Sequence, residues 1–66
     1  MIHTYEKLKA EALNAIVAKD SDKAHEVIGR ISMAYELDHL YWYQQAELTD
    51  MLEDAIALWR SEHEGN

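Results

Sequence analysis

The chain of 66 residues contains no cysteine, no proline and no phenylalanine, and only two glycines. Without cysteine it has no disulfide framework, no thiolate metal site and no cysteine nucleophile. Without proline, and with glycine only at Gly29 and Gly65, few residues interrupt a helix. Abundant alanine, leucine, glutamate and lysine favour helix throughout, and no alternating apolar and polar stretch predicts a strand.

Long apolar runs are also missing. No stretch approaches the roughly 20 apolar residues that a membrane-spanning helix needs, and charged residues among the first 20 positions interrupt any apolar core of a signal peptide. We therefore expect a cytoplasmic protein that does not enter a membrane.

Basic residues are scarce in the second half of the chain. The net charge is −7, from 13 acidic residues against 6 lysines and arginines. Residues 1–33 carry equal numbers of acids and bases, so the whole excess falls in residues 34–66, where Arg60 is the only lysine or arginine. This charge argues against direct binding of nucleic acid, and it is compatible with a basic protein partner.

Apolar residues make up 48% of the chain, which is enough for one small core and one domain, residues 1–66. Their helical spacing predicts helices over residues 3–19, 22–38 and 47–63. The polar run Asp20-Ser21-Asp22 predicts the first turn. An alternative joins the last two helices into one, because no turn-forming residue separates them.

These patterns predict an all-α fold, either a three-helix bundle or a two-helix hairpin. The hairpin buries its apolar face only by pairing with a second copy into a four-helix bundle. A core of fewer than about 70–80 residues rarely supplies more than ~3–5 kcal/mol, and self-association is a common remedy. We therefore expect a homodimer.

Two residue patterns concern the helices themselves. Asp50 and Glu53 have the spacing of a capping box, which would start the third helix close to them. Gly29 lies in the middle of the second helix, where it costs about 1 kcal/mol relative to alanine. It indicates either a helix that crosses closely at that point or an exposed position.

Three consecutive aromatic residues, Tyr41, Trp42 and Tyr43, are the clearest candidates for a functional site. On a helix they would cover about 200° of the circumference, more than a chain of this length can bury. Tryptophan and tyrosine dominate binding hot spots. We expect these three residues to contact another protein or a second copy of this chain, with Leu37 and Leu40 alongside. The alternative is a wide apolar face inside the core.

Glu47, Asp50 and Asp54 fall on one stripe of a helix, and we expect them to select the charge of the partner. An alternative function uses the acidic half alone. A row of carboxylates can occupy a basic groove that normally holds a nucleic-acid backbone, so the chain would inhibit its target by mimicry.

Glu36 and His39 form a Glu-x-x-His pair, the spacing used in helical di-iron carboxylate sites. Residues 36–45, ELDHLYWYQQ, resemble the first metal helix of encapsulated ferritins. This resemblance implies a dimeric metal-binding bundle as a further alternative. In that family the following helix carries its own Glu-x-x-His, whereas here Arg60 stands three residues before His63. The second pair is missing, so we assign no metal ligand and no cofactor.

No catalytic constellation is present in the sequence. It has no glycine-rich phosphate loop, and none of its serines lies in a nucleophile motif, so we do not expect an enzyme. In size, acidity and lack of cysteine the chain is similar to small plasmid- and phage-encoded regulators. That similarity of kind implies a cytoplasmic regulator that acts by binding.

Overall fold

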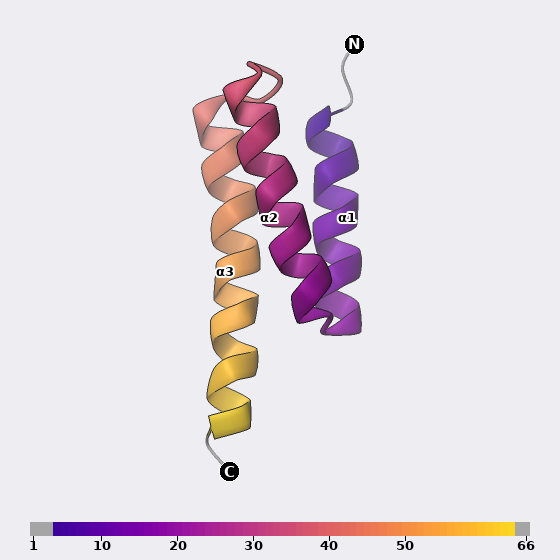
Figure 1. Cartoon of the computed structure of the whole chain (residues 1–66), viewed down its shortest axis with the longest axis vertical. Helices are drawn as coiled ribbons and strands as arrows, with labels where there is room; N and C mark the ends of the chain where they lie inside the picture. Colours follow the sequence, from indigo (N-terminus) through magenta and orange to yellow (C-terminus); the bar gives the residue numbers. More distant parts are fainter. Residues whose placement is uncertain (1–3, 65–66) are drawn as a thin grey trace.

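The computed structural model describes residues 4–64 and contains three α-helices in that range. α1 spans Thr4–Ala18, α2 spans Ser21–Glu36 and α3 spans Trp42–Glu64. α2 runs antiparallel to the other two helices, and α3 extends past the turn that joins α1 to α2 (Figure 1). No residue between 4 and 64 is in a strand. The predicted all-α three-helix bundle is confirmed, and the two-helix hairpin is not formed.

All three helices and the loop before α3 contribute to one apolar core. Within each helix the buried residues recur mainly at intervals of three or four, which places them on one face. They are Leu8, Ala12, Ala15, Ala24, Val27, Ile31, Ala34, Leu40, Leu48 and Leu52. Four of these ten are alanines, so the helices pack around small side chains. The core closes within a single chain.

A two-residue connection ends α1 and starts α2. Lys19 adopts a left-handed conformation with φ 54°. Its backbone N–H donates to the carbonyl of Ile16 at 3.1 Å, and that of Asp20 donates to the carbonyl of Ala15 at 3.0 Å. This is the Schellman pattern of a helix C-terminus. The Asp20 carboxylate then accepts from the backbone N–H of Lys23 at 3.0 Å, which caps α2.

α2 ends in the same way as α1, at the connection that leads to α3. Asp38 takes the left-handed conformation with φ 64°. Its N–H donates to the carbonyl of Tyr35 at 3.0 Å, and the N–H of His39 donates to that of Ala34 at 2.8 Å. Glycine usually occupies such a position, and its absence is why the sequence also allowed one continuous helix. The structure has a break at residues 37–41 instead.

α3 begins at Trp42, earlier than the predicted start near residue 47. Tyr41 is the residue before the first turn, and its carbonyl accepts from Gln44 and Gln45 N–H groups, both at 3.0 Å. The Gln44 side chain reaches back and accepts from the Tyr41 N–H at 3.0 Å. This is the returning half of a capping box. The capping box expected at Asp50 and Glu53 was wrong, because both residues lie inside α3.

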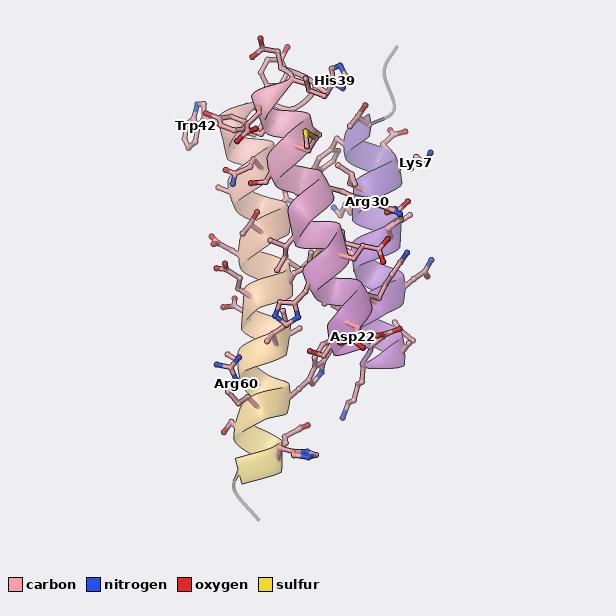
Figure 2. All side chains as sticks on the ribbon, viewed as in Figure 1. Lys7, Asp22, Arg30, His39, Trp42 and Arg60 are labelled. Atoms are coloured by element: carbon pink, nitrogen blue, oxygen red, sulfur yellow. The ribbon has the colours of Figure 1, made fainter. Side chains whose placement is uncertain are left out.

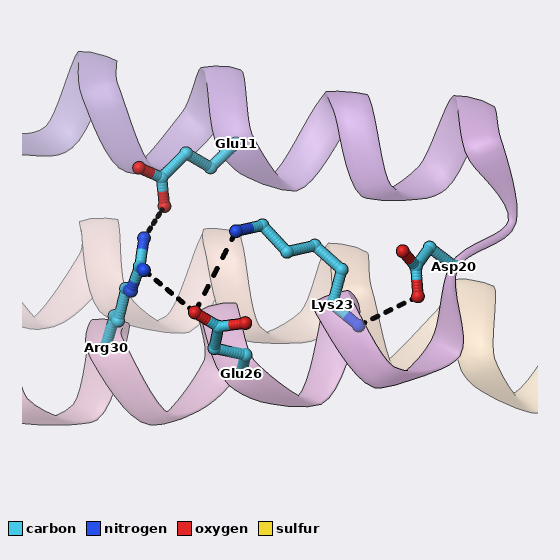
Figure 3. Close-up of polar contacts among 5 residues, drawn as sticks. All are labelled: Glu11, Asp20, Lys23, Glu26 and Arg30. Carbon is cyan, nitrogen blue, oxygen red and sulfur yellow. Dashed lines mark hydrogen bonds and ion pairs between the residues drawn. The ribbon is translucent and has the colours of Figure 1, made fainter.

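A surface ion pair joins α1 to α2, and two others lie within α2 (Figure 3). The Arg30 guanidinium donates to Glu11 of α1 at 2.6 Å and to Glu26 of its own helix at 2.8 Å. Lys23 also contacts Glu26, at 3.8 Å. Exposed pairs of this kind contribute about 0–1 kcal/mol each. Of these three pairs, the one between Arg30 and Glu11 links α1 to α2.

Gly29 is exposed, and a Cβ atom added to it would meet nothing within 4 Å. Of the two expectations for this residue, the exposed position is therefore the one that the structure shows. No helix crosses closely there.

Replacing this glycine should stabilise the protein. Gly29→Ala removes the entropy cost of glycine inside a helix and introduces no clash, so we expect the free energy of unfolding to rise by about 1 kcal/mol. Urea denaturation followed by circular dichroism measures the change. A variant no more stable than the parent chain would mean that α2 is not a continuous helix at this residue.

Candidate functional site

The consecutive aromatic residues lie at the start of α3 and form what we call the aromatic patch: Tyr41, Trp42 and Tyr43. The Tyr41 and Tyr43 rings stack with centroids 5.5 Å apart and planes within 5°. The Trp42 ring meets Tyr43 edge to face, at 5.9 Å and 88°. Such pairs contribute about 0.5–1.5 kcal/mol beyond the area they bury. The rings therefore hold one another in a defined arrangement.

The aromatic patch is open to solvent. Tyr41, Trp42 and Tyr43 are 66%, 69% and 53% exposed, and Trp42 projects outward at the start of α3 (Figure 2). The alternative expectation, in which these rings formed a wide face inside the core, does not match the structure.

Two contacts fix the backbone of the patch. Leu40, directly before Tyr41, is buried in the core, and the Gln44 cap holds the Tyr41 N–H. Leu40 was expected beside the aromatic residues as a contact residue. Its side chain is only 6% exposed, so it anchors the loop and does not reach the surface. Leu37, the other expected neighbour, is 57% exposed at the end of α2.

Glu47 has contacts within the chain. The Tyr5 hydroxyl donates to the Glu47 carboxylate at 2.9 Å, and the Lys9 ammonium lies 3.5 Å from the same oxygen. The hydrogen bond and charge of Tyr5, followed by the charge of Glu47, raise the pKa of Lys9 above its ordinary value. This cluster joins the start of α1 to α3. Glu47 is therefore engaged by α1, although the sequence suggested it for a partner.

Asp50, Glu53 and Asp54 are exposed on α3, and their side chains form no hydrogen bond or ion pair with any residue between 4 and 64. Asp50 stands three and four residues before the other two, so their like charges face one another along the helix. Such pairs destabilise a helix by roughly 0.2–0.5 kcal/mol each. The structure thus keeps a group of carboxylates that nothing in its described part neutralises.

A surface hollow of about 510 Å³ lies beside the aromatic patch, between the start of α1 and the loop before α3. Its lining mixes polar and apolar side chains: Thr4, Tyr5, Asp38, His39, Leu40, Tyr41 and Gln44. The hollow thus has the first turn of α1 on one side and Tyr41 of the patch on the other.

The metal-binding alternative placed Glu36 and His39 on one helix, and the structure does not. α2 ends at Glu36, and His39 lies in the following loop, so the two residues do not stand one turn apart on a helix as the resemblance to encapsulated ferritins requires. No group of three histidine, aspartate or glutamate side chains within residues 4–64 could hold a metal ion. Over the same range, no helix has the length and apolar character needed to cross a bilayer.

No family model matches this chain, and neither does any curated protein or solved structure. The functional argument therefore depends on the surface itself.

Gln44 was not predicted from the sequence to be part of the site. It stands three residues after Tyr41, which is the spacing of a capping box, but tyrosine replaces the usual serine or threonine. Tyr35, which is 42% exposed, was missed as a further aromatic residue near the end of α2. Its spacing from Ile28 and Ile31 places it on the same helix face as core residues, so the sequence pattern alone is typical of a core position.

The Gln44 side chain should control the order of the patch. Gln44→Ala leaves the Tyr41 N–H without its partner, so we expect a loss of about 1 kcal/mol in stability and greater mobility of the Trp42 and Tyr43 rings. Denaturation and the NMR signals of these rings measure both effects. Gln45→Ala is the control, since the Gln45 side chain makes no capping bond. Equal behaviour of the two variants would contradict this role of Gln44.

Proposed function

We propose that this chain is a small protein-interaction module that acts by binding a partner protein, without catalysis, through its aromatic patch. The observation that carries the proposal is the exposure of Tyr41, Trp42 and Tyr43, each of which is more than half exposed. Their rings contact one another, and they lie outside a core that the three helices already form. Burial of one large apolar side chain contributes about 1.5–3 kcal/mol. A partner that covers the patch would bury these side chains, and this burial would stabilise the complex.

The rigidity of the patch supports the same proposal. Binding normally costs about 0.5–1.5 kcal/mol for each flexible side chain that becomes ordered. The rings already contact one another, and the buried Leu40 and the Gln44 cap fix the backbone beneath them. Less conformational freedom is then lost on binding. We place the module in the cytoplasm as a regulator of its partner, in keeping with its small size and acidity.

Nucleic-acid mimicry is a second candidate. The exposed carboxylates of Asp50, Glu53 and Asp54, which nothing in residues 4–64 neutralises, favour it. A mimic would bind a basic groove through charge alone. Its binding would therefore survive the loss of Trp42 and fail on loss of the carboxylates, the reverse of what the aromatic patch requires.

Homodimerisation is a separate proposal, and exposed apolar side chains outside the patch support it. Leu13 and Val17 of α1 and Leu58 of α3 are 46%, 84% and 57% exposed. α1 carries equal numbers of acidic and basic residues, so two copies can approach through it without repulsion. Light scattering over a concentration range should show a dimer that Val17→Glu weakens. A parent chain that remains monomeric at high concentration would refute the dimer.

Binding through the patch should depend on Trp42. We expect Trp42→Ala to weaken association by about 2 kcal/mol or more, roughly 30-fold, because tryptophan is a frequent hot-spot residue. Helix content should change little, since Trp42 is outside the core. Affinity capture from cell extract, followed by titration of the captured protein, measures the loss. Val17→Ala removes an exposed apolar side chain elsewhere and is the matched control. A partner held equally by both variants would exclude the patch.

A further inference from the structure

We infer that the partner of the aromatic patch docks as a cationic amphipathic helix that lies along the outer face of α3, with lysine or arginine side chains over Trp42 and beside the carboxylates of Asp50 and Asp54. The inference rests on the proposed function and specifies the chemistry of the partner. The docking surface consists of the patch and the outer face of α3, and its charges indicate a cationic partner.

The part of α3 that follows the patch contains no lysine or arginine before Arg60. Between Arg30 and Arg60 the sequence contains neither residue. Lysines and arginines earlier in the chain contact acids of the bundle: Lys9 with Glu47, Lys19 with Glu62, and Arg30 with Glu11 and Glu26. Within residues 42–54, α3 carries four acids, of which Glu47 meets Lys9 of α1. The charges of Asp50, Glu53 and Asp54 remain, and charge complementarity favours a cationic partner.

The outer face of α3 has the shape for a second helix. Tyr43, Ala46, Asp50, Glu53 and Ala57 recur at intervals of three or four, so they share one stripe. Leu48 and Leu52 lie on the opposite, buried side. The alanines are small and allow a helix to approach closely. From Trp42 to Asp54 the rise is about 18 Å, which a partner helix of about 12 residues matches.

Trp42 adds a contact that selects positive charge directly. Of the aromatic side chains, tryptophan attracts a cation over its ring most strongly. Trp42 is 69% exposed, and its only ring contact within residues 4–64 is with Tyr43, edge to face. An arginine or lysine of the partner can therefore reach the indole while its neighbours on the same helix reach Asp50 and Asp54.

The same charges disfavour a second copy of this chain as the occupant. Two copies meeting patch to patch would bring together two α3 helices that each carry the exposed acids Asp50, Glu53 and Asp54. Like charges placed opposite one another at an interface oppose association. A nucleic acid, which is itself an anion, is disfavoured for the same reason. The patch thus differs from the neutral surface of α1 at which a homodimer can form.

Two synthetic peptides provide a direct test with the full chain. Both are 14-residue helices with leucine on one face, and their polar face carries either lysine and arginine or glutamate. Isothermal calorimetry measures affinity, and the NMR signals of Trp42 locate the site. We expect only the cationic peptide to bind at Trp42, with an affinity that falls about tenfold or more from low to high salt.

Matched variants separate local charge from net charge. Asp54→Asn and Asp22→Asn each remove one exposed carboxylate, but Asp22 lies at the start of α2, away from Trp42 (Figure 2). We expect Asp54→Asn to weaken the cationic peptide about threefold, and Asp22→Asn to leave its affinity unchanged. Equal effects of the two variants, or binding of the cationic peptide away from Trp42, would overturn the inference.

The two proposals fail in distinguishable ways. If Trp42→Ala abolishes capture of the cellular partner, but that partner binds independently of salt and of Asp54, the interaction module stands and the cationic helix is wrong. If Trp42→Ala changes neither capture nor peptide binding, both proposals are wrong. If light scattering shows that Trp42→Ala abolishes a dimer of the parent chain, the occupant is a second copy and the inference is overturned.

Discussion

The reversal of the chain between α2 and α3 is the constraint on which the rest of the surface depends. Asp38 accepts a left-handed conformation so that the last carbonyls of α2 are paired, and Leu40 enters the core immediately afterwards. The next residue is then already at the start of α3. Tyr41, Trp42 and Tyr43 follow directly after Leu40, and each of them is more than half exposed.

The composition of the core has the same consequence. Four of the ten buried core residues are alanines, and within residues 4–64 no aromatic ring is among the buried side chains. Leucine, isoleucine and valine supply the remaining buried side chains. Of the aromatic residues in the described range, Tyr5 and Trp59 pack at the edge of this core. Aromatic area that such a narrow core cannot hold remains on the surface, where a partner can use it.

The charged residues of α1 and α2 contribute to stability, whereas the exposed acids of α3 are available for binding. Bases on α1 and α2 form ion pairs that join the helices, including Lys9 with Glu47 and Arg30 with Glu11. The carboxylates of Asp50, Glu53 and Asp54 contribute nothing comparable and repel one another along α3. Their arrangement costs stability, and a cationic partner would offset that cost.

The sequence alone determined the helical class, the first turn at Asp20 and the presence of aromatic residues beyond what a small core can bury. Those features follow from local preferences and from area, which need no knowledge of neighbours. Only the tertiary structure decided that the chain breaks at Asp38, that Leu40 is buried and that Glu47 is engaged by α1. Each depends on contacts between distant segments, because a left-handed aspartate, a buried loop leucine and an interhelical ion pair leave no periodic pattern in the sequence.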